Sequence, residues 1–183
     1  MSITTATRQE ALPTGTWNLD PVHSSVGFEV DYMVGAFRGQ FRDVDARLVV
    51  GGESARLTGA AQVASVEVKD ENLEAHLQSP DFFDAERHPE LRFEGSDIVR
   101  SGDEVTIRGE ITIKGVTKTV ELTGTITDPI TDPYGRQRIG LRLETALDRT
   151  EFGLSWNVPL PDGKPALADE VRLTADLYFV EEA

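Results

Sequence analysis

The sequence is dominated by a period-two alternation of apolar and polar residues. The pattern is clearest where Val105, Ile107, Ile111 and Ile113 alternate with threonine, arginine and glutamate. Successive side chains of a β-strand point to opposite faces, so a segment of this kind has one buried face and one exposed face. The sequence therefore predicts a β-strand over residues 105–113 with one side against a core.

The same alternation returns along most of the chain. Further strands are expected over residues 17–19, 26–32, 44–50, 55–66, 91–98, 120–126, 139–147 and 171–179. About eight or nine strands joined by short turns, without long helices between them, indicate a sandwich or a barrel. Hairpin connections favour the barrel, which leaves no exposed edge. The predicted fold is all-β, an antiparallel up-and-down β-barrel of about eight strands.

Three segments interrupt the strands. Lys114-Gly115 separates two alternating runs and predicts a hairpin turn with a positive φ at Gly115. Residues 70–78 carry leucines at an i, i+4 spacing behind an N-capping aspartate, so a short helix is expected near residues 70–78. Residues 150–169 contain three prolines and predict a long loop of the kind that borders a site.

Length and charge limit the classes of protein that fit. The 183 residues suit a single domain, which we expect over residues 15–183 after a disordered segment 1–14. The net charge of −14 argues against nucleic-acid binding, because phosphate recognition needs a basic surface. The sequence has no apolar run long enough to span a bilayer and no secretory signal pattern, so a cytoplasmic location is expected.

Sequence motifs for catalysis or metal binding are missing. The chain has no cysteine, and its three histidines, His23, His76 and His88, form no close ligand pair. It also lacks a nucleophile elbow, a P-loop and a dinucleotide-binding glycine motif. We therefore predict no catalytic residue, no metal site and no cofactor.

Several short motifs resemble those of a known family. They are WNLDPVHSSVGF at residues 17–28, GQF at 39–41, HLQSPDFFD at 76–84, GVTK at 115–118 and RTEFGL at 149–154. In this order they resemble the YceI-like polyisoprenoid-binding proteins, over about residues 15–180. The resemblance implies a lipocalin-like barrel with a helix between two strands. It also implies a long isoprenoid ligand, as in a quinone or polyprenyl lipid, and no established catalysis.

The chain departs from the family pattern at three positions. Tyr32 stands where the family has a histidine, and Glu74 and Ala75 stand where it has an Arg-Asp pair before the helix histidine. If those polar groups hold a ligand head group, this chain prefers a different head group or none. Binding of an apolar tail depends on the barrel lining and is less affected.

The candidate ligand-binding residues combine apolar lining with polar groups at the barrel mouth, where Tyr32, His76 and Arg149 are expected. Aromatic residues of this kind line a cavity or pack a solid core, and alternation does not separate the two. The full set is Phe28, Val30, Tyr32, Phe41, His76, Leu77, Phe82, Phe83, Phe93, Arg149 and Trp156.

Three functions remain open at this point. The first is a binding or carrier protein for an isoprenoid or similar long-chain lipid held inside the barrel. The second is an enzyme acting on a hydrophobic substrate, with His23 or His76 as the general base. The third is a filled-barrel structural or interaction protein. A homodimer is also left open, because no sequence feature decides it.

Overall fold

Antiparallel strands make up most of residues 11–183, the part of the chain that the computed structural model describes. Of the segment 1–14, which is expected to be disordered, residues 1–10 lie outside the described residues. The strands are β1 (Gly15–Leu19), β2 (Ser25–Tyr32), β3 (Gly35–Phe41), β4 (Val44–Gly51), β5 (Ser54–Gln62), β6 (Val66–Glu67), β7 (Glu90–Ser101), β8 (Glu104–Ile113), β9 (Val116–Ile126), β10 (Ile130–Thr131), β11 (Gln137–Asp148) and β12 (Leu167–Glu181). One α-helix within these residues, α1 (Glu71–Gln78), and two short 3₁₀ helices, η1 (Val63–Ser65) and η2 (Arg149–Phe152), lie between them.

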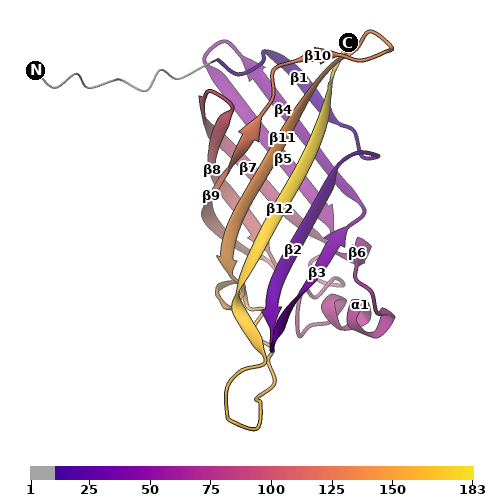
Figure 1. Cartoon of the computed structure of the whole chain (residues 1–183), viewed down its shortest axis with the longest axis vertical. Helices are drawn as coiled ribbons and strands as arrows, with labels where there is room; N and C mark the ends of the chain where they lie inside the picture. Colours follow the sequence, from indigo (N-terminus) through magenta and orange to yellow (C-terminus); the bar gives the residue numbers. More distant parts are fainter. Residues whose placement is uncertain (1–10) are drawn as a thin grey trace, which may run out of the picture.

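Eight of the described strands close into a barrel (Figure 1). Around the barrel the strands follow the order β4, β5, β7, β8, β9, β11, β12 and β1, and each strand pairs with the next. The ring is closed by β1, which pairs with both β12 and β4. All of these pairings are antiparallel. The structure thus confirms the predicted up-and-down barrel and the short helix near residues 70–78.

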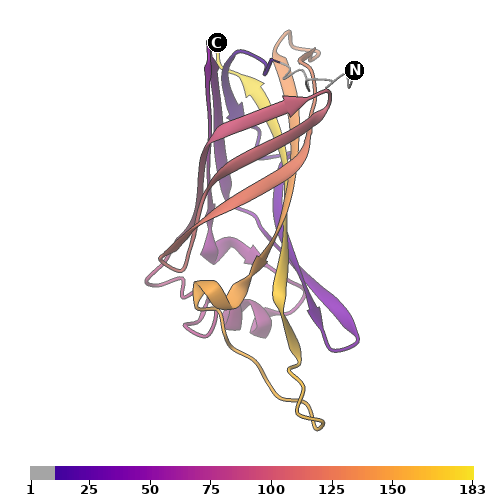
Figure 2. The ribbon, with the colours of Figure 1, turned by 90° about the vertical axis from the view of Figure 1, so that its left-hand side faces the viewer.

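The wall of the barrel changes partners along β12. β1 pairs with residues 179–181 of β12, whereas β2 pairs with residues 167–176 of the same strand. The β2–β3 hairpin therefore extends the wall in one direction, past the point where β1 and β4 end. We call that end, which also carries α1 and η2, the helix end (Figures 1 and 2). The opposite end, where β1 begins and β12 stops, is the termini end.

Local sequence signals explain the hairpin and the helix. Lys114 and Gly115 have φ values of 50° and 76°, as a tight turn between β8 and β9 requires. Asp70 caps α1, since its carboxylate accepts a 3.0 Å hydrogen bond from the backbone N–H of Leu73. Leu77 is buried and holds the helix against the core.

No helix within residues 11–183 is long and apolar enough to cross a membrane.

The inward-facing side chains form two groups along the barrel axis. The group at the termini end is tightly packed, and its largest members are almost fully buried: Trp17, Leu48, Ile107, Ile126, Leu143 and Phe179. The group at the helix end combines strand residues with Leu77 of α1 and with residues of the turns that follow it. Side chains of the first group fill the interior at the termini end, and some of its members, such as Leu57 and Leu143, also face the middle of the barrel.

Candidate functional site

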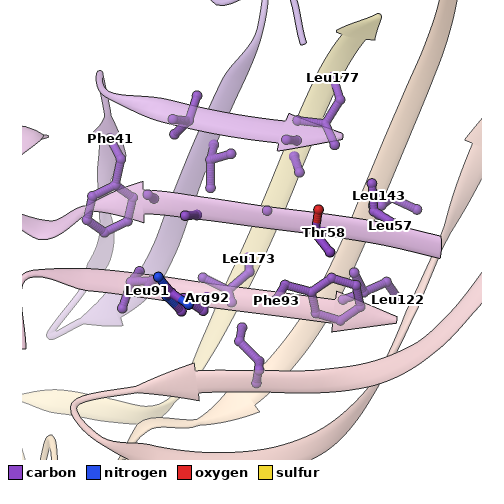
Figure 3. Close-up of a pocket in the computed structure, with 18 of the residues that line it drawn as sticks. Phe41, Leu57, Thr58, Leu91, Arg92, Phe93, Leu122, Leu143, Leu173 and Leu177 are labelled. Carbon is purple, nitrogen blue, oxygen red and sulfur yellow. The ribbon is translucent and has the colours of Figure 1, made fainter. Parts of the chain in front are cut away.

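A cavity of about 130 Å³ occupies the middle of the barrel. It exists because small residues, Ala46, Gly59 and Ala61, face inward from β4 and β5 at this level. Figure 3 shows Phe41, Phe93 and Leu173 around it, on different strands. The surface that these strands present to the cavity is almost entirely apolar. The larger apolar residues along it are Leu19, Val26, Phe41, Val44, Leu57, Leu91, Phe93, Ile111, Leu122, Leu143, Leu173 and Leu177.

A second cavity of about 60 Å³ lies at the helix end. It shares Phe41, Leu91 and Leu173 with the central cavity, so these three side chains separate two adjoining spaces. Together the two cavities form an apolar column that runs from mid-barrel toward α1 and η2. The remaining lining residues of the second cavity are Phe28, Val30, Phe37, Leu77, Phe82, Phe83, Ile113, Leu147, Arg149, Phe152, Leu154, Leu167 and Val171.

Arg149 is the charged residue on the lining of the second cavity, and its side chain is 5% exposed. Its Nε donates to the carbonyl of Ala168 at 2.8 Å, and Nη1 donates to the carbonyls of Leu154 and Trp156. Burial lowers the pKa of this guanidinium, and the nearby carboxylate of Asp169 partly opposes the change. Because its donors are used on backbone carbonyls, Arg149 fixes the chain that follows η2 against the barrel.

His76 joins the helix to the same chain segment. Its ring packs edge-on against Phe82 and Trp156, with centroids 4.9 Å and 4.6 Å away. Its Nε2 lies 3.0 Å from a carboxylate oxygen of Asp81. The imidazole is therefore the centre of a contact between α1, the turn after it and the segment that follows η2. This contact covers the helix end of the apolar column.

The candidate residues gather at the helix end, with differences in role. The residues of the set that line the second cavity are Phe28, Val30, Phe41, Leu77, Phe82, Phe83 and Arg149. Phe41 and Phe93 line the central cavity. His76 and Trp156 lie outside both linings and pack on Phe82. Tyr32 also lies outside them, 41% exposed at the end of β2.

The sequence reasoning missed the aliphatic and small residues of the site. Leu91 and Leu173 separate the two cavities, and Ala46 and Ala61 leave the central space open. The inward phase of each predicted strand already identified several of these positions. Selection by aromatic character left them out, because small residues give no signal until the opposite wall is known.

Neither histidine proposed as a general base is part of the lining of the apolar column. His23 is at the termini end, where its Nδ1 lies 2.8 Å from a carboxylate oxygen of Asp20. His76 is engaged as described above, and neither histidine lines either cavity. Within residues 11–183, no three histidine, cysteine, aspartate or glutamate side chains are grouped so as to hold a metal ion.

Sequence comparisons cover nearly the whole barrel. The family profile described as "YceI-like domain" matches residues 17–179. A UPF0312 protein of Staphylococcus epidermidis is 28% identical over 171 residues, which span 89% of this chain and 96% of that protein. Protein YceI of Escherichia coli O157:H7 is 26% identical over 140 residues, or 74% of this chain and 73% of that protein.

Solved structures share the same fold. BcnA of Burkholderia cenocepacia superposes with a TM-score of 0.73 at 23% identity, covering 87% of this chain and 98% of that one. A polyisoprenoid binding domain from Saccharophagus degradans, implicated in plant cell wall breakdown, superposes with a TM-score of 0.66 at 10% identity. That match covers 91% of this chain and 98% of the domain. At these identities the likeness establishes the barrel architecture.

Proposed function

This chain belongs to the YceI-like family, and from that premise we propose that its barrel interior binds one long apolar ligand, the isoprenoid chain of a lipid or quinone. The protein would act as a carrier or buffer for that ligand. The observation that carries the proposal is the apolar column formed by the two adjoining cavities. The polyisoprenoid-binding description of the Saccharophagus degradans domain, which has the same fold, supports the choice of ligand class.

The energetics of such a column suit a hydrocarbon chain. Each buried methylene contributes about 0.8 kcal/mol, so a few isoprene units offset the cost of ordering a flexible chain. The column is closed at the termini end by the packed group around Leu48, Ile107 and Phe179. The ligand tail would therefore point toward the termini end, and its head group would remain near the helix end.

A long chain needs more room than the two cavities provide separately. Their volumes of about 130 and 60 Å³ lie below the range of roughly 300–1,000 Å³ for pockets that hold drug-sized ligands. The side chains that separate them, Phe41, Leu91 and Leu173, must change rotamer to join the two spaces. We expect binding to begin at the helix end and to push these three side chains toward the wall.

The proposal is tested by identifying bound lipid and then by blocking the column. Protein purified from its native host is extracted with organic solvent, and the extract is analysed by mass spectrometry. Purified protein is then mixed with prenols of increasing length, and the melting temperature is recorded. A bound prenol should raise the melting temperature with concentration, since ligand that binds the folded state stabilises it.

Ala61→Leu is the matched blocking variant. Ala61 is buried on the lining of the central cavity, so the added carbons fill existing space and should leave the fold stable. We expect Ala61→Leu to reduce prenol binding at least tenfold. Thr123→Leu, on the exposed face of β9, adds apolar bulk outside the barrel and should bind normally. Absence of lipid in the extract together with absence of a prenol-induced shift would overturn the proposal.

A further inference from the structure

Two segments at the helix end project beyond the barrel (Figures 1 and 2). Both carry apolar side chains that are exposed to solvent. One is the β2–β3 turn with Tyr32, Met33 and Val34, and the other is the loop before β12, which carries Val158. Met33 and Val34 are 55% and 106% exposed, and Tyr32 and Val158 are 41% and 44% exposed. We call these four residues the apolar tip.

Backbone hydrogen bonds join the two segments into one surface. The N–H of Met33 donates to the carbonyl of Ala166 at 2.8 Å. The N–H of Ala166 in turn donates to the carbonyl of Val158 at 2.9 Å. Val158 and the β2–β3 turn are therefore held side by side across Ala166. The apolar tip is a fixed feature of the helix end and not two unrelated loops.

The residues at this turn are unusual for their backbone positions. Met33 has a φ of 49°, a left-handed conformation that non-glycine residues adopt at a cost and that favours asparagine, aspartate or glycine. At the β8–β9 turn, Lys114 has a similar φ of 50°, but its side chain is polar. At the β2–β3 turn, the chain instead carries methionine and a fully exposed valine. The fold alone does not require apolar side chains there.

The shape of the apolar tip fits a soft surface better than a folded protein. A stable protein interface uses about 20–30 residues from each partner, on surfaces that match in shape. The apolar tip offers four side chains on a convex projection, which is too little for such an interface. Projecting apolar side chains can, however, enter the boundary between head groups and acyl chains of a bilayer.

The apolar tip is continuous with the wall of the apolar column. Tyr32 pairs with Leu167 of β12, and Leu167 lines the second cavity. Further along the β2–β3 hairpin, Val30 pairs with Phe37, and both of these side chains line the same cavity. One hairpin therefore carries both the cavity wall and the tip. A surface that receives the tip also lies against the end of the barrel at which the proposed ligand enters.

The charges favour an uncharged bilayer. In the loop before β12, Asp162 and Lys164 are both exposed and balance each other, and Asp31 beside the turn is paired with Arg172 at 2.9 Å. The chain as a whole carries a net charge of −14. We propose that the apolar tip docks the helix end on a bilayer of zwitterionic lipid by shallow insertion. Docking extends the proposed function, because it puts the ligand entrance against a membrane that can supply the ligand.

Vesicle flotation with the full chain tests this proposal. Phosphatidylcholine vesicles, without and with phosphatidylglycerol, are mixed with protein at low and at high salt. We expect binding to phosphatidylcholine that salt does not weaken, and no gain from the anionic lipid. Met33→Asn with Val34→Ser should weaken binding roughly tenfold, since it removes two apolar side chains from the contact. Asparagine suits the left-handed position, so this variant should fold.

The matched control is Val22→Ser, which removes an 84% exposed valine from the termini end. It should bind vesicles like the unmodified protein. The proposal is overturned if Val22→Ser loses as much binding as the tip variant, if the tip variant binds normally, or if binding needs anionic lipid and disappears in high salt. The melting shift of the tip variant with a short prenol is measured without vesicles. If the tip variant keeps the prenol-induced melting shift but no longer binds vesicles, the proposed function stands. If neither the unmodified protein nor the variants show a shift, and no lipid is extracted, the proposed function is overturned, and the flotation result still decides whether the tip docks on a bilayer.

Discussion

The guanidinium of Arg149 donates a 2.9 Å hydrogen bond to the backbone carbonyl of Trp156, seven residues along the chain. The same side chain reaches the carbonyls of Leu154 and Ala168. Residues 153–166 contain little regular structure apart from an isolated bridge between Pro159 and Pro165. In place of a strand ladder, the segment is held over the helix end by the buried Arg149 side chain, together with Asn157, whose side-chain amide bonds the backbone of Leu167.

Replacing Arg149 with methionine should destabilise the fold by about 3 kcal/mol, because buried carbonyls lose their donors. Urea denaturation followed by tryptophan fluorescence measures the free energy of unfolding. Arg142→Met is the control, since Arg142 is 75% exposed on β11 and pairs with Asp176 in solvent. That variant should unfold almost like the unmodified protein. Equal effects of the two substitutions would contradict the structural role given to Arg149.

Gly124 makes the closest backbone approach of the barrel glycines. A Cβ at this position would lie 1.7 Å from the carbonyl oxygen of Arg142 on the neighbouring strand β11. Gly124→Ala should force β9 and β11 apart and cost roughly 2 kcal/mol or more. Gly51→Ala, at the end of β4, meets nothing within 4 Å and should cost nothing. Thermal unfolding of both variants checks the expectation, which is wrong if they melt together.

Much of the fold could be predicted because the signals are local. The alternation at residues 105–113 is the strand β8, Glu104–Ile113, and the turn at Lys114-Gly115 follows it directly. The helix near residues 70–78 is α1, Glu71–Gln78, with Asp70 as its cap. Each of these features depends on side-chain spacing or backbone conformation within a few residues. The exchange of β1 for β2 along β12 depends on distant pairing, and no local pattern encodes it.

The sequence alone does not distinguish a cavity from a solid core, for a physical reason. Strand alternation places Ala61 and Ile107 on inward faces alike. Whether space remains depends on the sizes of the residues that meet across the barrel, and those come from strands far apart in the chain. The residue type predicts a polar group at the mouth at position 149, and the structure shows that the Arg149 guanidinium donates to the backbone carbonyls of Ala168 and Trp156. Its partners arise from loop conformation, which the sequence does not specify.

An ion cluster at the termini end should make the stability of the protein sensitive to acid. Burial raises the pKa of Asp20, but hydrogen bonds from His23, Arg138 and the N–H of Val22 outweigh that effect and lower the pKa to about 2. A hydrogen bond from Arg138 likewise lowers the pKa of Asp132. Both carboxylates therefore favour the folded state when they are ionised.

The sign of the pH effect follows from that shift. Because the pKa of Asp20 is lower in the folded protein than its ordinary value of 3.8, the stabilisation by this carboxylate is complete above about pH 4 and is lost as the pH falls toward 2. Asp20→Asn should remove about 1 kcal/mol of this acid-dependent stability, after allowance for solvent screening. Melting temperatures between pH 4 and 2 measure it. Asp97→Asn, at an exposed position on β7, is the control, and an equally flattened pH profile for that variant would refute the assignment.

The polar groups around the helix end predict a preference among ligand head groups. On the lining of the second cavity, Arg149 is already engaged with backbone carbonyls. At the same end, the Nζ of Lys114 donates to the carbonyls of Pro80 and Gly153, and His76 is paired with Asp81. These donors are already occupied and cannot bind a diphosphate, and the net charge of the chain is −14.

A neutral prenol or quinone should therefore bind at least tenfold more tightly than a diphosphate with the same tail. Competition of the two ligands for a fluorescent prenol analogue, at low and high salt, measures the ratio. Equal or tighter binding of the diphosphate at both salt concentrations would show that a charged head group is recognised.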